Sequence, residues 1–387
     1  MSEFNVKFVS QKISKIRWRP TLRQALQKSN YFATGSWDDE ENKLSIWHLE
    51  QLNKDESMIS RAATLLENEP RQMCEVHHTG DVTDLSYLSL EVLAAASSTG
   101  DLSLYRHDAN NQTLTQSYQW EKLHWVKNQS CPCTCLATRG EEMLVTGGED
   151  GRLIVLAVGH TQPITVFDNA DSCTINGVTF LKQSEVATVN SFGQLKIYDL
   201  RQKGEAAKTF SAMEEHIALQ CVDQHPSQSY ILATGGRDGM LTIWDLRQEK
   251  FPMTLLEAHN ATLWEVKFHP TNPDHLFTCS DNGSLWHWDG TLMTSSNTDI
   301  HTGSQIGLGG LSGGDNAQRK VSNRAAVVES HNSPWLTLES SRHKLDITSL
   351  LPTKSLPVNS LDIEGNALIC GTDSETIYTV CLAGLLR

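Results

Sequence analysis

Residue types that could do acid–base chemistry gather near the middle of the chain, at Ser211, His216 and Asp238. In a hydrolase, a histidine between a carboxylate and a serine hydroxyl activates that serine as a nucleophile. The same stretch also contains Thr234 and Trp244. An imidazole, a carboxylate, a hydroxyl and an indole N–H can instead form a chain of structural hydrogen bonds. These residues therefore have a catalytic and a structural interpretation.

A second copy of the polar set decides between the two interpretations. The copy consists of His259, Thr278, Asn282 and Trp288. Catalytic sites are single, whereas polar sets that repeat along a chain belong to its architecture. We therefore predict no catalytic residues and a structural tetrad that consists of His216, Thr234, Asp238 and Trp244.

The cysteines offer little support for a metal site. There are 9 of them, an odd number spread through predicted strands, which favours reduced thiols in a cytosolic or nuclear compartment. The one cluster is Cys131, Cys133 and Cys135, but a zinc site normally needs four ligands and no second pair follows. Motifs for nucleotide binding or hydrolysis are also absent in a suitable context. We expect neither a metal nor a cofactor.

The elements that must position these residues repeat at a fixed period. Ile231–Arg247 contains an apolar run, an Asp-Gly turn and a second alternating run, a pattern typical of a β-hairpin. His225 recurs as His269 and Gly239 recurs as Gly283 at the same offset, within the roughly 40–45 residue period of WD repeats. Each such unit is a four-stranded propeller blade. The chain thus resembles WD-repeat β-propellers.

Seven such units follow one another along the chain. The turns of units two to six are marked by Gly100, Gly151, Gly193, Gly239 and Gly283. The last unit, at residues 358–382, has three predicted strands, whereas residues 4–9 form a lone strand before the first unit. We predict that residues 1–387 form a single all-β, seven-bladed propeller whose N-terminal strand completes the last blade. This closure would remove an exposed sheet edge.

Residues 290–343 interrupt the repeat. They are rich in Ser, Gly, Asn and Thr and lack an alternating strand pair, so we predict a flexible insertion within blade six. Residues 344–351 would then be the delayed fourth strand of that blade. The insertion contains one apolar island, Ser333–Leu336, and we expect its Trp335 to dock either on the propeller or on a partner.

The negative charge of the chain disfavours nucleic acid and anionic membranes as partners. Its 32 basic and 46 acidic residues give a net charge of -14 and a pI near 5.5, so its field repels nucleic acid and anionic membranes. The first residues lack the apolar core of a signal peptide, and no apolar run approaches the roughly 20 residues that span a bilayer. We expect a soluble chain made in the cytosol, with protein partners, no direct nucleic-acid binding and no membrane insertion.

Aromatic residues outside the repeat pattern are the candidate partner contacts. Tyr118, Trp120 and Trp125 lie in a longer than average connection between blades two and three. Aromatic side chains in loops are typical interface hot spots. Trp120 could equally end a strand and pack inside. With Trp335, these residues complete the set of candidate contacts.

One segment indicates a different function class. Ile243–Arg247 resembles the W-D-x-R box of propellers that serve as substrate receptors for cullin-RING ubiquitin ligases. Trp-Asp is also simply the repeat signature, and arginine two positions later is common in ordinary repeats. A ubiquitin-ligase substrate receptor is therefore the alternative function.

A closer resemblance covers nearly the whole chain. It is carried by K-F-V-S-Q-K-I-S-K at Lys7–Lys15, R-W-R-P at Arg17–Pro20, F-A-T-G-S-W-D at Phe32–Asp38, D-N-A-D-S at Asp168–Ser172, G-Q-L-K-I at Gly193–Ile197, H-L-F-T-C-S-D-N-G-S-L-W-H-W-D at His275–Asp289, and I-T-S-L-L-P at Ile347–Pro352. These strings are similar to those of the small WD-repeat nucleoporins of the Y-shaped complex, which builds the outer rings of the nuclear pore.

The resemblance implies a non-catalytic scaffold subunit of the nuclear pore complex at the nuclear envelope. It also implies other outer-ring nucleoporins as partners, most of all an α-helical solenoid subunit in the short arm of the Y. Support of nucleocytoplasmic transport and pore assembly, and recruitment to kinetochores in mitosis, are further implications. The family lends no catalytic, cofactor or metal residues to this chain.

Overall fold

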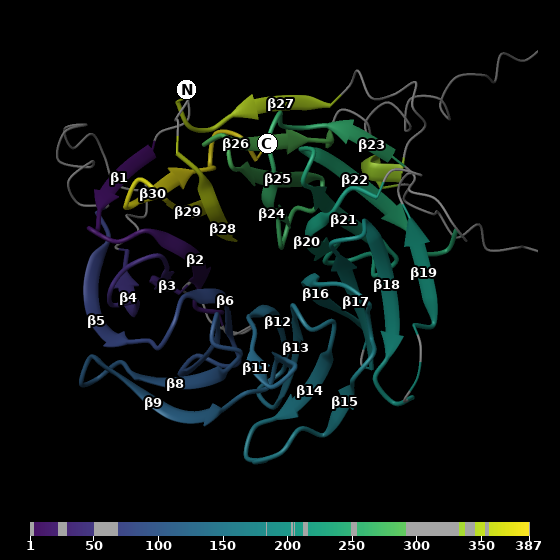
Figure 1. Cartoon of the computed structure of the whole chain (residues 1–387). Helices are drawn as coiled ribbons and strands as arrows, with labels where there is room; N and C mark the ends of the chain where they lie inside the picture. Colours follow the sequence, from purple (N-terminus) through teal and green to yellow (C-terminus); the bar gives the residue numbers. More distant parts are fainter. Residues whose placement is uncertain are drawn as a thin grey trace, which may run out of the picture.

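Four-stranded sheets arranged around a common axis make up the fold (Figure 1). Their innermost strands line a hollow, which we call the central channel. The computed structural model describes residues 4–21, 29–49, 69–182, 184–202, 204, 206–211, 216–248, 254–291, 333–336, 345–352 and 356–386. Within these ranges the strands form seven antiparallel four-stranded sheets and one separate two-stranded hairpin. A short 3₁₀-helix, η2 (Pro334–Leu336), lies beside blade five. The predicted all-β, seven-bladed propeller is confirmed.

The first four blades run in chain order. Blade one contains β2 (Ile13–Trp18), β3 (Tyr31–Ser36), β4 (Lys43–His48) and β5 (Arg71–His77). Blade two contains β6 (Val82–Tyr87), β7 (Val92–Ser97), β8 (Leu102–Asp108) and β9 (Thr113–Trp120). The hairpin β10 (Trp125–Val126) and β11 (Gln129–Ser130) follows. Blade three contains β12 (Cys133–Arg139), β13 (Met143–Gly148), β14 (Leu153–Ala157) and β15 (Thr165–Phe167). Blade four contains β16 (Ile175–Lys182), β17 (Glu185–Asn190), β18 (Gln194–Asp199) and β19 (Lys208–Ser211).

The last three blades complete the ring. Blade five contains β20 (Leu219–Gln224), β21 (Ile231–Gly236), β22 (Met240–Asp245) and β23 (Thr254–Glu257). Blade six contains β24 (Leu263–Phe268), β25 (His275–Ser280), β26 (Leu285–Asp289) and β27 (Asp346–Ser349). Blade seven contains β28 (Val358–Glu364), β29 (Ala367–Thr372), β30 (Thr376–Cys381) and β1 (Phe4–Phe8).

The second strand of each blade explains how the sheets pack. β21 and β25 are buried along their whole length because each lies between two neighbouring sheets. Small residues on these strands, such as the three alanines of β7, let adjacent sheets approach closely. Apolar clusters consequently fill the spaces between blades, and Trp244 packs against blade four in one of them. The first strand of each blade lines the channel beside the first strand of the next blade (Figure 1).

Closure of the ring occurs within blade seven. β1 pairs with β30 in antiparallel register, from Phe4 opposite Val380 to Phe8 opposite Thr376. Figure 1 places the purple N-terminal strand beside the last strands of the chain. Phe4 also packs on Tyr378, with ring centroids 6.1 Å apart. The predicted closure by an N-terminal strand is confirmed.

Blade six receives its fourth strand late in the chain. β27 pairs with β26, with Trp288 opposite Ile347, as expected for the predicted delayed strand. The predicted flexible insertion at residues 290–343 lies outside the described residues, apart from residues 290–291 and the island at 333–336.

Deletion of residues 1–9 tests the closure. The deletion removes the β1–β30 hydrogen bonds and the packing of Phe4, and leaves β30 as a bare edge. We expect a loss of several kcal/mol and a fall in Tm of roughly 5–10 °C in thermal unfolding. Phe8→Ser is the control, because that side chain is 62% exposed and its replacement should change stability by less than about 0.5 kcal/mol. An unchanged Tm after the deletion would contradict closure by β1.

Candidate functional site

The predicted polar tetrads are partly assembled in blades five and six. In blade five the indole N–H of Trp244 donates to the Thr234 hydroxyl at 2.9 Å. In blade six Trp288 donates to Thr278 at 3.0 Å, and His259 Nε2 lies 2.8 Å from the same hydroxyl. The backbone N–H of Met240 donates to Asp238, which shapes the turn between β21 and β22. These contacts hold the loops of each blade to its two central strands.

His216 differs from the prediction. Its side chain is exposed and stacks on Phe192, with ring centroids 3.7 Å apart. The bonded histidine of blade six, in contrast, is buried beside its threonine. An exposed imidazole can exchange its hydrogen bonds with water, so the spacing of residue types alone does not place it in the network.

Blade three contains a fuller network that the sequence analysis missed. His124 is fully buried, and its two ring nitrogens lie 2.9 Å from Asp150 Oδ1 and 3.0 Å from the Thr146 hydroxyl. Burial favours a higher pKa for Asp150, but the hydrogen bond and charge of His124 outweigh it and leave the pKa below its usual value. A Cβ at Gly148 would collide with the His124 ring, so glycine makes room for it. The order His, Thr, Asp matches the tetrad of blade five and could have revealed this set.

A second group of polar residues lines the central channel. The carboxylate of Asp84 on β6 accepts the backbone N–H of Leu136 on β12 at 2.8 Å. Glu265 on β24 accepts the N–H of Leu361 on β28 at 2.8 Å, from the equivalent strand position. Each carboxylate therefore joins the innermost strand of its own blade to that of the next blade.

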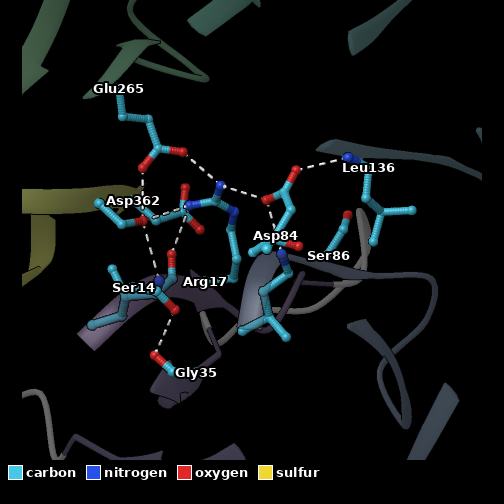
Figure 2. Close-up of polar contacts among 12 residues, drawn as sticks. Ser14, Arg17, Gly35, Asp84, Ser86, Leu136, Glu265 and Asp362 are labelled. Carbon is cyan, nitrogen blue, oxygen red and sulfur yellow. Dashed lines mark hydrogen bonds and ion pairs between the residues drawn. The ribbon is translucent and has the colours of Figure 1, made fainter. Parts of the chain in front are cut away.

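Arg17 on β2 connects these carboxylates (Figure 2). Its Nη2 lies 2.5 Å from Glu265 Oε1 and 3.4 Å from Asp84 Oδ1. Its Nη1 donates to the Ser360 hydroxyl at 2.9 Å, and that hydroxyl donates to Glu265 at 2.7 Å. One guanidinium thus links four blades: one, two, six and seven.

Burial and charge set the protonation of the channel residues. Burial alone would raise the pKa of Glu265, but the positive charge of Arg17 dominates and lowers it to about 2. Asp223 accepts the N–H of Phe268 at 2.8 Å, and burial raises its pKa to about 6, partly offset by Lys267. At neutral pH these carboxylates are therefore charged acceptors for backbone N–H groups.

The hairpin between blades two and three forms a candidate interaction surface. Lys127 and Asn128 connect β10 and β11 with positive φ angles of 49° and 67°, the backbone of a type I′ turn. The turn presents Trp125 and Val126, which are 39% and 45% exposed. Exposed apolar side chains on a rigid hairpin are a typical protein contact.

Trp125 lies at the edge of a pocket of about 420 Å³. The Arg152 guanidinium lies over its ring, 4.1 Å from the centroid, and also pairs with Asp168 at 3.0 Å. The backbone N–H of Trp125 donates to Asp150 at 3.0 Å, which anchors the hairpin to the buried network of blade three. Arg152 was not predicted from the sequence. Its position after the turn glycine Gly151 gives no indication that it would stack on a loop tryptophan.

The other aromatic candidates are less accessible. Trp120 is buried at the end of β9, and its indole donates to the carbonyl of His160 at 3.0 Å. Tyr118 packs edge-on against it with ring centroids 4.7 Å apart. Of the two interpretations of Trp120, the structure supports packing inside, and the residue forms only part of the pocket wall.

Trp335 docks on the propeller itself. Its side chain is 2% exposed, and its indole N–H donates to the carbonyl of Pro273 at 2.8 Å. It also packs edge-on against Phe268. In this conformation Trp335 is not an available partner contact.

The arginine of the W-D-x-R segment contacts residues of its own blade. Arg247 pairs with Asp245 at 2.6 Å and lies over the Tyr230 ring, 3.8 Å from its centroid. Arg201 pairs with Asp199 in blade four in the same way. The repeated pairing makes this segment part of the turn after the third strand.

The described residues contain no metal-binding cluster and no membrane-spanning helix. No group of three or more His, Cys, Asp or Glu side chains there could hold a metal ion. Burial raises the pKa of Cys131 to about 11 and that of Cys135 to about 12, so both are thiols at neutral pH. No described helix is long and apolar enough to cross a membrane.

Comparison with known proteins places the chain in a family. The family model described as "WD domain, G-beta repeat" matches residues 206–245 and 250–289, which span the last strand of blade four, the strands of blade five and the first three strands of blade six. The chain is 46% identical to nucleoporin Nup43 of Mus musculus and 45% identical to nucleoporin Nup43 of Homo sapiens, over 385 residues and 98% of both chains in each case. The chain belongs to the Nup43 family of nucleoporins. A nuclear pore complex protein, nup43 of Dictyostelium discoideum, is 26% identical over 38% of this chain and 35% of its own length. The resemblance noted in the sequence strings is confirmed.

The Arg17 cluster yields a stability prediction. Arg17→Met leaves the buried Glu265 and the partly buried Asp84 without this cation, so we expect a loss of about 3–5 kcal/mol in urea unfolding. Arg106→Met is the matched control, because its pair with Glu91 is solvent-exposed and should contribute less than about 1 kcal/mol. The double variant Arg17→Met/Glu265→Gln should lose less than the sum of the single variants. Equal, small losses for Arg17→Met and Arg106→Met would contradict the role of the cluster.

The buried histidines yield a pH prediction. Burial lowers to about 4 the pKa values of His78, His225, His259 and His287. Their unfolded pKa is about 6.5, so the unfolded state binds more protons between the two values and stability falls as pH falls through that range. Burial also raises the pKa values of four carboxyl groups, which act in the opposite direction: Asp39, Asp223, Asp274 and Asp362. They are fewer than the histidines with lowered pKa values, since burial also lowers those of His107 and His275.

We therefore expect the free energy of unfolding to be smaller at pH 5 than at pH 7, by roughly 1–2 kcal/mol per buried histidine before the opposing term. Urea unfolding at the two pH values measures the difference. His259→Gln should reduce this pH dependence by about one proton. Equal stability of the unsubstituted chain at both pH values would contradict the burial argument.

Proposed function

We propose that the chain is a non-catalytic structural subunit of the Y-shaped complex in the outer ring of the nuclear pore. The observation that carries this proposal is the 46% identity to mouse Nup43 along 98% of both chains. The geometry is consistent with it, because histidines and carboxylates that could do chemistry are held in hydrogen bonds within and between blades. A closed ring of this kind suits a rigid platform for other proteins.

The partners in this proposal are other outer-ring nucleoporins, above all an α-helical solenoid subunit of the short arm. The Trp125 surface is the contact we favour, because an aromatic ring and the pocket beside it can receive an apolar side chain from a partner helix. Arg152 holds the ring in place, so little side-chain entropy would be lost on binding.

Location and cell-cycle role are part of the same proposal. The chain would reside in nuclear pores at the nuclear envelope, support transport and pore assembly, and move to kinetochores in mitosis. The kinetochore role has the resemblance of the sequence strings as its sole support. We propose no ubiquitin-ligase function, because Arg247 is held by Asp245 and Tyr230 and the full-length relatives are nucleoporins.

Affinity capture of the tagged chain from cell extract tests the function. We expect outer-ring nucleoporins in stoichiometric amounts, with no change for an Arg247→Ala variant. A cullin ligase adaptor that is recovered with the unsubstituted chain and lost with Arg247→Ala would overturn the proposal. Imaging of the tagged chain tests location, and a nuclear rim without kinetochore labelling in mitosis would remove the kinetochore role alone.

Substitution of Trp125 tests the contact surface. Trp125→Ala should weaken capture of the helical nucleoporin by at least about tenfold, because a hot-spot aromatic contributes on the order of 2 kcal/mol. Phe192→Ala is the control, since that ring is 45% exposed on the corresponding side of blade four. Unchanged capture by a folded Trp125→Ala chain, with the same Tm, would place the contact elsewhere.

A further inference from the structure

The island Ser333–Leu336 packs against blades five and six of the propeller, at a docking position that we call the groove. η2 lies beside β22 (Figure 1). Trp335 inserts toward Phe268 of β24, with ring centroids 5.8 Å apart, and its indole N–H binds the carbonyl of Pro273. The hydroxyl of Thr254 on β23 donates to the Trp335 carbonyl at 3.5 Å. A segment from far along the chain thus completes the apolar cluster of these blades.

The first residue of the island has a hydroxyl that no described residue bonds. Ser333 is 4% exposed, and its Oγ has no hydrogen-bond partner among the described residues. An unpaired buried hydroxyl costs roughly 1–3 kcal/mol relative to an apolar atom in the same place. Docking of the island therefore needs the backbone and Trp335, and would proceed at least as well with alanine at position 333.

The sequence gives this serine a chemical context. Of the 11 prolines in the chain, Pro334 alone directly follows a serine or threonine. Proline-directed protein kinases act on a serine or threonine whose next residue is proline. Ser333 is consequently the single position in the whole chain that such a kinase can recognise by this rule.

We propose that Ser333 is the phosphorylation site of a proline-directed kinase, and that phosphorylation and docking of the island exclude each other. In the reaction the Ser333 Oγ loses its proton to the kinase base and bonds to the γ-phosphorus of ATP. The bond from that phosphorus to the β-phosphate oxygen breaks, and ADP leaves. This inference does not depend on the proposed pore function.

Burial explains why the docked island cannot carry the phosphate. A phosphoserine has a charge of about −1.5 to −2 at neutral pH, which is costly in an apolar groove. Two acidic residues also flank the contacts of the island in the sequence, since Asp274 follows Pro273 and Asp289 precedes Gly290. Like charge there disfavours the phosphate further. The modified island should leave the groove and expose Trp335.

The same exclusion acts in reverse. A kinase must bind an extended segment around its target, and the docked Ser333 side chain is buried, so the kinase can act only on the undocked chain. Because the two events are linked through one equilibrium, any change that releases the island should speed its phosphorylation.

Gly290 provides a way to release the island without changing its sequence. A Cβ at Gly290 would lie 2.9 Å and 3.0 Å from Cβ and Cγ of Pro334 and 3.1 Å from the Asp274 carbonyl oxygen, so Pro334 must shift to admit it, and the backbone of Gly290 is not in the left-handed region. Gly290→Ala therefore weakens docking of the island by steric contact. Trp335→Ala releases it by removing the anchor and serves as the reference for the undocked state.

The experiment uses the purified full chain, a purified proline-directed kinase and ATP. We expect about one phosphate per chain, located at Ser333 and absent from Ser333→Ala, and a rate at least about tenfold higher for Gly290→Ala. In amide hydrogen exchange, residues 333–336 should be protected in the unmodified chain and in Ser333→Ala. They should exchange rapidly in the phosphorylated chain, as in Trp335→Ala.

Three results would overturn the inference. The first is an unmodified Ser333 in the Gly290→Ala chain, which would mean that the released segment is not a substrate. The second is an equal phosphorylation rate with and without Gly290→Ala, which would remove the link to docking. The third is full protection of residues 333–336 in the stoichiometrically phosphorylated chain.

Discussion

The ring depends on a hydrogen bond that recurs around the channel, from the backbone N–H of one innermost strand to a side-chain oxygen on the preceding blade. Leu136 donates to Asp84, Leu361 donates to Glu265, and Ile16 donates to Ser360 from equivalent strand positions. A buried backbone N–H needs such an acceptor, and a buried carboxylate needs such a donor. Arg17 then neutralises the two carboxylates in the middle of this arrangement (Figure 2). The blades are thus joined where the last and first blades meet, beside the place where β1 completes the sheet.

Because these hydrogen bonds join the innermost strands, the outer strands and the connections between blades can differ from one blade to the next. The hairpin β10–β11 forms a separate sheet in the connection between blades two and three, and β12 still pairs with β13 in blade three. In blade six, β26 and β27 are far apart in the sequence. The sheet tolerates this because β27 pairs at its outer edge, away from the channel. A proposed partner contact such as Trp125 can therefore be placed on a connection without disturbing the polar network that holds the blades together.

The sequence predicts the repeated elements of the fold, but it does not predict contacts between single side chains that lie far apart in the chain. The hairpin period, the seven blades and the closing strand followed from alternation and turn glycines, because these patterns are local. Spacing predicts that His216 belongs to a tetrad, but its exposed ring stacks on Phe192. The sequence does not predict the ion pairs of Arg17, since its partners Asp84 and Glu265 lie far along the chain and meet it only when the ring closes. The sequence predicts that Trp335 docks either on the propeller or on a partner. In the structure it contacts Pro273 and Phe268, so it docks on the propeller.

The most direct test of the chain as a platform is site-specific photo-crosslinking in intact cells. A photoreactive phenylalanine analogue at position 125 should crosslink to one outer-ring nucleoporin, whereas the same analogue at position 192 should give no such product. Crosslinking to that nucleoporin from position 192 and not from position 125 would contradict the proposed contact. The absence of any nucleoporin from the products at both positions would contradict the platform itself.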